Sequence, residues 1–405
     1  MEIAPRSQTT VNINKWRLSL TLYLNYLIHG FGIIILAQNM TALGNSWNVP
    51  LKTVSFVISG IGIGRLIAYL ITGSLADLLS RKLFVVIGML AYLVFAVGMV
   101  MNPSIPVAYG LAILAGIANS ALDAGTYTTL VEINHGRGDG TILLKGFVSI
   151  GEFILPLIVA MLANLGWWFG WSFIVMAALT ILNLINVLSV KFPNHQQLRQ
   201  MAAQAKMGPV TKGWRKITQT LLLLGYGYTS MALMIWFTQW ITLFAQRSLN
   251  FSETAGHFLL SLYSIGSITG VIILFILLNR AVSEFKLLIA LNLTAVIALV
   301  TLIWFGQIIW LADLASFTFG FAAAGGVMQT GLTVFMKLYP ARHGMVTGAF
   351  YFFSSLASFT VPIITGMLST NSIALAFAGD LVIGLTGSIF MILLTLIARS
   401  SKEEA

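Results

Sequence analysis

The sequence predicts an all-α membrane protein with twelve transmembrane helices. The 405-residue chain is 58% hydrophobic and only 8% charged, whereas soluble proteins carry about 25% charged residues. Its long apolar runs are separated by short polar loops, which is typical of helical membrane proteins and not of β-barrels with alternating strands. Composition therefore excludes a soluble globular protein and favours a bundle of membrane-spanning helices.

Twelve apolar runs of membrane length support this count. A helix needs about 20 residues to cross the hydrocarbon core, and each run is close to that length or longer. The polar segment 1–17 precedes the first run without a small-residue cleavage site, so we interpret that run as a retained span. In order, the predicted spans are 18–43, 50–75, 83–101, 105–132, 140–164, 168–190, 219–245, 255–279, 286–305, 308–337, 344–369 and 373–398.

The loops between these spans differ strongly in positive charge. If both termini are cytoplasmic, only Lys52 and Arg247 of the 22 lysines and arginines fall in outside segments, and Arg65 lies within a span. Cytoplasmic loops of membrane proteins carry this excess of basic residues, so we predict that both termini are cytoplasmic. The same asymmetry explains the net charge of +10, which therefore gives no evidence of nucleic-acid binding.

The longest polar stretch, 191–218, lies near the midpoint and carries several basic residues. We interpret it as a cytoplasmic linker that joins two bundles of six helices. The predicted domains are an N-terminal six-helix bundle, 1–190, and a C-terminal six-helix bundle, 219–405.

The two bundles show a weak internal repeat. Residues 154–162 (ILPLIVAML) resemble 360–368 (TVPIITGML), which aligns Pro156 with Pro362. In the preceding spans, Gly116 aligns with Gly320, because Gly116 precedes Pro156 by almost as many residues as Gly320 precedes Pro362. Parallel six-span repeats are one of the known transporter architectures, so the two halves are predicted to be pseudo-symmetric.

One loop carries a family motif. The segment GSLADLLSRK, between spans two and three, resembles the major facilitator superfamily motif G-x-L-a-D-r-x-G-r-K, with Leu78 in place of a basic residue and Ser80 in place of a glycine. The resemblance implies the major facilitator fold and a conformational latch in this loop. The alternative is that these charges only mark a cytoplasmic loop. The matching residues are Gly73, Leu75, Asp77, Arg81 and Lys82.

Four further segments are similar to a smaller group within that family. NYLIHGFG, GIGRLIAYL, GIANSALDAGTYTTLVE and FGWSF resemble bacterial inner-membrane permeases of the YdiM/YdiN type, which implies a multi-pass protein of the bacterial cytoplasmic membrane. The fourth-span R-x-x-x-G pattern and the fifth-span G-P pair of proton-driven drug exporters are both absent. Their absence weighs against a multidrug antiporter.

Four ionisable residues lie near the middle of apolar spans: His29, Arg65, Asp123 and Glu152. A charge at the bilayer centre costs about 2.5–3.5 kcal/mol on insertion scales, so such residues normally face a partner or a water-filled cavity. All four lie in the first half of the chain. They predict a polar cavity within the bundle, and such a cavity is most simply a solute path.

Other polar side chains share helix faces with these four. Asn25 precedes His29 by four residues, and Asn119, Asp123 and Tyr127 recur at the same spacing, which places them on one face of a helix. The family resemblance implies that spans one, two, four and five of each half surround the path. The predicted substrate-binding residues are Arg65, His29, Asn25, Asn119, Tyr127, Tyr228, Gln329 and Tyr351.

Each charged candidate has two interpretations. Arg65 either anchors an anionic group through its planar guanidinium or forms a structural salt bridge with Asp123 or Glu152. Glu152 and Asp123 either carry coupled protons as the cavity opens and closes or stay paired with Arg65 and Lys145. His29 either switches protonation near neutral pH or is a neutral hydrogen-bond donor.

The sequence therefore predicts a secondary active transporter that works by alternating access as a monomer in the lipid bilayer. We predict a proton-coupled symporter of a small organic anion or zwitterion, with an aromatic or cyclic body. The alternatives are a proton-driven exporter of a metabolite or drug and a transport-dead membrane sensor. The chain has no cysteine, and no ATP-binding motif, metal cluster or catalytic triad is visible, so no enzyme activity and no cofactor or metal is predicted.

Overall fold

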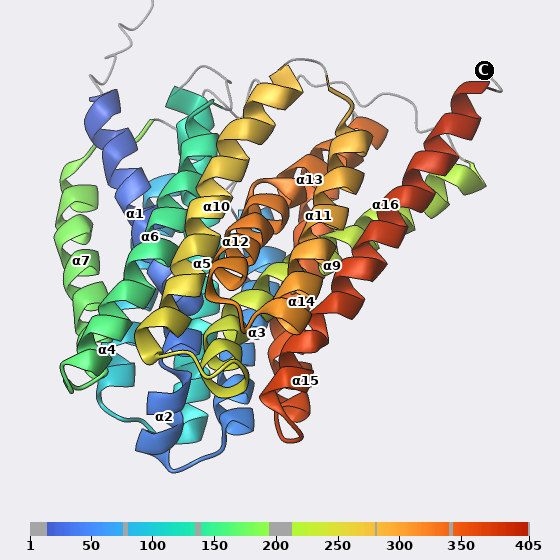
Figure 1. The fold of residues 1–405 in the computed structure, drawn as a ribbon. Helices are drawn as coiled ribbons and strands as arrows, with labels where there is room; N and C mark the ends of the chain where they lie inside the picture. The colour runs from blue at the N-terminus through green and yellow to red at the C-terminus, as the bar shows by residue number, and fades with distance from the viewer. Residues whose placement is uncertain are drawn as a thin grey trace, which may run out of the picture.

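The computed structural model is a bundle of helices, most of which run between its two ends (Figure 1). It describes residues 14–75, 80–133, 139–193, 213–279, 282–339 and 343–403. Within these ranges, twelve helical segments are long and apolar enough to cross a membrane. The predicted all-α fold with twelve transmembrane helices is therefore confirmed.

The N-terminal half supplies the first six spans. Between the first two of them, the short helix α2 (Met40–Trp47) lies at the bottom of the bundle in Figure 1. We call this the lower end, and we call the end where α1 begins and α16 finishes the upper end. The spans are α1 (Lys15–Gln38), α3 (Leu51–Leu75), α4 (Arg81–Val100), α5 (Ile105–Ile133), α6 (Asp139–Asn164) and α7 (Gly170–Ser189).

The C-terminal half supplies the other six, and two of them are interrupted. The tenth span divides into α12 (Ile309–Phe319), the π-helical turn η1 (Gly320–Ala324) and α13 (Val327–Leu338). The twelfth divides at Gly379, between two helices. The remaining bounds are α9 (Trp214–Ser248), α10 (Glu253–Asn279), α11 (Glu284–Phe305), α14 (His343–Leu368), α15 (Ile373–Ala378) and α16 (Asp380–Glu403).

Helix α9 begins at Trp214, four residues before the predicted end of the linker, 191–218. Residues 194–212, which make up most of that linker, lie outside the described residues. The division into two domains joined by this linker therefore stays a prediction.

The two halves pack their helices in the same way, as the sequence repeat predicts. A Cβ on Gly116 of α5 would lie 2.0 Å from the Ile61 carbonyl oxygen, and one on Gly320 would lie 1.9 Å from that of Tyr263. Each glycine thus lets the fourth span of its half pack directly on the second. Pro156 and Pro362, which the repeat aligns, both lie inside the fifth span of their half, in α6 and α14.

Between the halves, α3 packs along α14, and α6 packs along α10. Gly62 is part of the first contact, because a Cβ there would lie 2.2 Å from the backbone nitrogen of Phe359. Ser149 of α6 and Ser267 of α10 form a hydrogen bond of 3.1 Å in the second. These two pairs of helices enclose the space in which the site lies.

The lower end of the interface is closed by polar contacts between the halves. Gln38 at the end of α1 lies 2.7 Å from Nδ1 of His257 and 3.3 Å from the hydroxyl of Thr242. Nearby, Asn164 donates a hydrogen bond of 2.7 Å to Thr254. We call this set of residues the lower seal: Gln38, Thr242, His257, Asn164 and Thr254.

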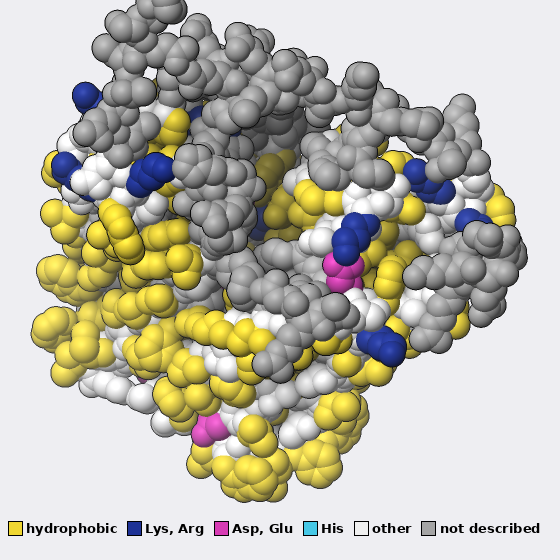
Figure 2. All heavy atoms as spheres, turned by 90° about the horizontal axis from the view of Figure 1, so that it is seen from above, with side chains coloured by type: hydrophobic (Ala, Val, Ile, Leu, Met, Phe, Trp, Pro, Cys, Tyr) yellow, Lys and Arg dark blue, Asp and Glu magenta, His cyan; other side chains and the backbone are white. Residues whose placement is uncertain are grey.

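The upper face looks different (Figure 2). Lysine and arginine side chains lie around its rim. Lys337, in the last turn of α13, forms an ion pair of 2.6 Å with Glu284. Hydrophobic side chains cover the sides of the bundle in the same view, as expected for a surface in contact with lipid.

Candidate functional site

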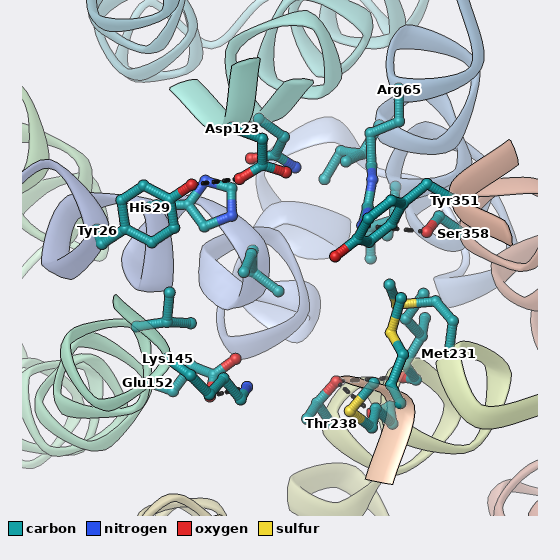
Figure 3. Close-up of a pocket in the computed structure, with 18 of the residues that line it drawn as sticks. Tyr26, His29, Arg65, Asp123, Lys145, Glu152, Met231, Thr238, Tyr351 and Ser358 are labelled. Atoms are coloured by element: carbon teal, nitrogen blue, oxygen red, sulfur yellow. Dashed lines mark hydrogen bonds and ion pairs between the residues drawn. The ribbon is translucent and has the colours of Figure 1, made fainter. Parts of the chain in front are cut away.

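A cavity of about 160 Å³ lies between the two halves (Figure 3). His29, Arg65, Asp123 and Glu152 all line it, so the structure brings together the four residues that the sequence singled out. They come from four different helices, α1, α3, α5 and α6. From the N-terminal half the lining is Tyr26, His29, Ile33, Ile58, Ile61, Arg65, Asn119, Asp123, Lys145, Val148 and Glu152.

The carboxylate of Asp123 is held by two tyrosines. The Tyr26 hydroxyl donates to Oδ1, and the Tyr69 hydroxyl donates to Oδ2 over 2.6 Å. Asp123 forms no ion pair with Arg65 within 4 Å among the described residues. Each carboxylate oxygen thus accepts a hydrogen bond from a tyrosine, and the two bonds fix the position of Asp123 inside the bundle.

His29 belongs to a second hydrogen-bonded group. Its Nδ1 lies 3.0 Å from the Tyr92 hydroxyl, which itself donates to Oδ1 of Asn119. Because a tyrosine hydroxyl has one proton to give, Tyr92 accepts from His29, and Nδ1 of His29 carries a hydrogen. The hydrogen bonds thus orient the imidazole at the cavity wall.

Glu152 and Lys145 lie one above the other on α6, with Oε2 and Nζ 3.9 Å apart. Oε2 of Glu152 is buried and has no hydrogen-bond partner in the described part of the chain. The distance is at the limit for an ion pair, and a pair without a hydrogen bond satisfies neither charge fully. Glu152 therefore keeps an unsatisfied carboxylate oxygen beside the cavity.

Arg65 has no carboxylate partner within 4 Å among the described residues. Its guanidinium lies beside Tyr351 and Ser358 in Figure 3 and forms one long hydrogen bond of 3.4 Å to Ser358. Nε is buried and unpaired in that part of the structure. A guanidinium offers five N–H donors, so most of the binding capacity of Arg65 is free.

The C-terminal half lines the opposite wall without any charged side chain among its described residues. Its wall is mostly apolar, with sulfur atoms and aromatic rings facing the cavity. At the upper end of the cavity, the ring of Tyr351 stacks on Tyr69 across the halves, with centroids 5.7 Å apart. The lining residues are Met231, Met234, Ile235, Thr238, Tyr263, Met328, Gln329, Tyr351, Ser358 and Pro362.

Two predicted substrate-binding residues lie away from the cavity. Asn25 is buried on α1 and accepts a hydrogen bond of 2.6 Å from Asn183 of α7. Tyr228 shares a hydrogen bond of 2.8 Å with Thr360. The side chain of Tyr127, a third candidate, lies outside the described residues.

Sequence reasoning did not assign Tyr26 or Lys145 to the site. Tyr26 precedes His29 by three residues, a spacing that places both on one face of α1, so the signal was present. Lys145 shares a face with Glu152 in the same way. Met231 and Met234 gave no signal, because methionine is common throughout the apolar spans.

The residues of the predicted latch are only partly described. Gly73 lies in the last turns of α3, and Asp77 lies outside the described residues. Ser80, where the motif has glycine, caps α4 by accepting a hydrogen bond of 3.3 Å from the Leu83 amide. Arg81 is the first residue of α4, and Lys82 donates to the carbonyls of Leu188 and Val190 at 2.8 and 2.9 Å.

Comparison with known proteins agrees with this architecture. Residues 22–362 match the Major Facilitator Superfamily. The chain belongs to this superfamily. It is accordingly a multi-pass membrane transporter and not an enzyme.

Three bacterial relatives cover most of the chain. Inner membrane transport protein YdiM of Escherichia coli is 37% identical over 95% of both chains. The uncharacterized MFS-type transporter YfkL of Bacillus subtilis is 36% identical over 91% of this chain and 93% of its own. Inner membrane transport protein YdiN of E. coli is 31% identical over 86% of this chain and 83% of its own. The similarity that the sequence motifs indicated is confirmed.

Solved structures show the same fold at low identity. A D-xylose–proton symporter superposes with a TM-score of 0.74 at 12% identity, covering 94% of this chain and 97% of the other. The nucleoside transporter NupG (D323A mutant) superposes with a TM-score of 0.72 at 14% identity, covering 95% and 99%. These structures establish the fold and leave the solute of this chain open.

Proposed function

We propose that the chain imports a small organic anion or zwitterion with a cyclic or aromatic body, by proton-coupled symport across the bacterial cytoplasmic membrane. The observation that carries this proposal is the Arg65 guanidinium at the cavity wall, which has no carboxylate within 4 Å in the described part of the chain. Inside a membrane protein, a cation without a carboxylate partner is costly. An anionic group on the solute would offset that cost.

The opposite wall fits the rest of such a solute. Met231, Met234 and Met328 present flexible, polarizable sulfur atoms, and Tyr263 and Tyr351 present rings. Such side chains contact apolar and aromatic groups favourably. A cavity of about 150 Å³ in another protein takes up benzene, so 160 Å³ suits a solute with a single ring.

The two carboxylates are the proposed proton carriers, and their surroundings differ. Asp123 accepts two tyrosine hydroxyls, whereas Glu152 has an unsatisfied oxygen and a single cation at 3.9 Å. Both oxygens of Asp123 already accept hydrogen bonds, whereas Oε2 of Glu152 accepts none in the described part of the chain. We therefore propose Glu152 as the main coupling residue and Asp123 as the second.

The contacts between the halves fit alternating access. The lower seal joins the halves through side-chain hydrogen bonds alone, and such bonds exchange with water at small net cost. Breaking them while the halves tilt would open the cavity downwards. Helix α1 begins and α16 ends at the upper end, and we propose that this end faces the cytoplasm, as the distribution of basic residues predicts.

A thermal-shift screen of the purified protein tests the proposed solute class. Organic acids, amino acids and aromatic metabolites are added singly, because a ligand that binds only the folded state raises its stability by about 2.7 kcal/mol at one hundred times its Kd. We expect shifts from ring-bearing acids that disappear in R65A. Arg17→Ala is the matched control, since Arg17 lies outside the cavity and bonds to Ser189.

Uptake of the solute identified in this way into proteoliposomes tests direction and coupling. Accumulation driven by an inward proton gradient is the result expected for a symporter. Accumulation driven by the opposite gradient would contradict symport and support an exporter. Shifts given only by neutral or cationic compounds, and kept in R65A, would contradict the anion proposal.

A further inference from the structure

Asp380 is a carboxyl buried in the C-terminal half, outside the cavity described above. It is the first residue of α16, directly after the corner that separates this helix from α15, and it is 0% exposed. Neither Oδ1 nor Oδ2 has a hydrogen-bond partner in the described ranges. An isolated ionised carboxylate in an apolar interior is strongly disfavoured, and the group becomes neutral instead.

The corner around Asp380 is built from aromatic side chains. The Trp236 indole donates a hydrogen bond of 2.5 Å to the Ala376 carbonyl, and its ring fills the space beside Gly379, where a Cβ would lie 2.4 Å away. Phe377 stacks on Phe244 with ring centroids 4.3 Å apart. These contacts bond the Ala376 carbonyl to another partner and pack aromatic rings against Gly379 and Phe377, close in sequence to the buried carboxyl.

Polar and charged groups on the neighbouring elements do not neutralise Asp380. On α9, Arg247 is exposed, and on α10, His257 is bound to Gln38. On α11, Glu284 is paired with Lys337, and Lys286 is exposed. Among the described residues no lysine, arginine or histidine lies within 4 Å of the Asp380 carboxylate.

A row of aromatic rings links this corner to the cavity. Tyr263 of α10 lines the cavity, and its ring stacks on Phe237, with centroids 5.3 Å apart. The Phe237 ring in turn lies 5.8 Å from that of Phe377, three residues before Asp380. Asp380 therefore lies behind the cavity wall, although it does not line the cavity itself.

We propose that Asp380 is a proton-binding site of the C-terminal half, occupied in the conformation seen here and emptied when the lower seal opens. The corner between α15 and α16 lies towards the lower end of the bundle (Figure 1). Opening that end would bring water to Tyr263 and to the carboxyl behind it. Water stabilises the ionised form, so the proton would leave towards the lower side.

A proton fits this site better than a metal cation does. Hard cations in proteins take several oxygen ligands at once. The surroundings of Asp380 offer aromatic rings, and the carbonyl of Ala376 is already bonded to Trp236. A single neutral carboxyl needs no further ligand.

Infrared spectroscopy of the full-length protein in lipid tests the first part of this proposal. A protonated carboxyl has a C=O stretching band of its own, outside the backbone amide bands. We expect such a band at neutral pH in the unaltered chain and in Asp313→Asn, and we expect its loss in Asp380→Asn. If D380N does not fold, incorporation of ¹³C-labelled aspartate into the unaltered chain should shift the band.

The second part of the proposal rests on the proposed rocking of the halves, and a crosslink tests it. The chain has no cysteine of its own, so Asn164→Cys with Thr254→Cys can be joined by a short thiol crosslinker to hold the lower seal closed. We expect the band to disappear at alkaline pH in the uncrosslinked protein and to persist in the crosslinked one.

Four results would overturn the inference. Identical spectra for D380N and the unaltered chain, or no shift on aspartate labelling, would show that Asp380 carries no proton. Loss of the band on addition of Na⁺ at constant pH would show a metal site instead. A band that responds equally to pH with and without the crosslink would remove the link to the lower seal. A crosslink that leaves transport unchanged would contradict the proposed alternating access. That result is separate from the infrared result on Asp380.

Discussion

The two halves of the molecule share one packing scheme and differ in their chemistry. Gly116 and Gly320 let equivalent helices pack at nearly identical distances, yet every charged residue described in the cavity lining comes from the N-terminal half. The C-terminal half contributes methionines, tyrosines and uncharged polar groups to the same cavity. The repeat therefore preserved the scaffold while the two walls of the cavity diverged.

This difference teaches how a symmetric carrier can orient an asymmetric solute. A charged wall fixes the charged end of the solute by directional hydrogen bonds. An apolar wall with methionine side chains adapts to the shape of the remainder. The C-terminal half does contain a buried carboxyl, Asp380, but it lies behind the wall and not in it.

The largest effect is expected from neutralising Glu152. Glu152→Gln keeps the shape of the side chain and removes the proton site, so accumulation driven by a proton gradient should fall to the level of empty vesicles, while solute exchange continues. Asp123→Asn should show the same pattern less completely, because its two tyrosine partners remain. Net uptake and counterflow in proteoliposomes measure the two activities, with Glu284→Gln as the control outside the cavity. Unchanged uptake in both cavity variants would remove these carboxyls from the mechanism.

A smaller but still large effect is expected from Arg65→Ala. Hydrogen bonds to charged groups contribute about 1.5–3 kcal/mol, so solute affinity should weaken about 10- to 150-fold. Arg65→Lys should recover part of this loss, because it restores the charge without the planar fork. Titration of the solute against thermal stability measures the affinity. Normal affinity in both variants would show that Arg65 is not the anchor.

The shared packing of the halves predicts matched losses of stability. Gly116→Ala and Gly320→Ala each place a Cβ against a carbonyl at about 2 Å, and overpacking typically costs about 1–3 kcal/mol. Gly110→Ala and Gly348→Ala are the controls, because a Cβ there meets nothing within 4 Å. Thermal unfolding in detergent measures all four. A loss in only one half would contradict equivalent packing.

The smallest effect is expected at the apolar wall. Met231→Ala removes part of a flexible surface, and each buried CH₂ contributes about 0.8 kcal/mol, so solute affinity should weaken about five-fold. Met101→Ala, at a residue that is 76% exposed, should leave the affinity unchanged. If M231A weakened binding as much as R65A does, the division of roles between the halves would be wrong.

Much of the site was predictable because charge stands out in an apolar sequence. His29, Arg65, Asp123 and Glu152 each lie alone in a membrane-length run, and the cost of burying them implies a common cavity. The fold followed from the same contrast between apolar runs and basic loops. Where the sequence is uniformly apolar, as around Met231 and Met234, no local signal tells which face of a helix meets the cavity.

Two features of the structure could not be predicted from the spacing of residues in the sequence. Asn25 lies four residues before His29, but four residues turn an α-helix by about 40° more than a full turn, and this is enough to direct Asn25 to Asn183 of α7. The break before Asp380 depends on Trp236, which is distant in sequence and fills the space beside Gly379. Both outcomes are set by neighbouring helices and not by the local residues.

The most direct test of the account is the accessibility of one cavity residue from both sides of the membrane. Ile61 lines the cavity, and Ile61→Cys is the single thiol in an otherwise cysteine-free chain. In vesicles of each orientation, a charged membrane-impermeant thiol reagent should label it from either side, whereas Ile67→Cys on the exposed flank stays unlabelled. Labelling of I61C from neither side would show a dry, closed core and would contradict a cavity that opens alternately between the two halves.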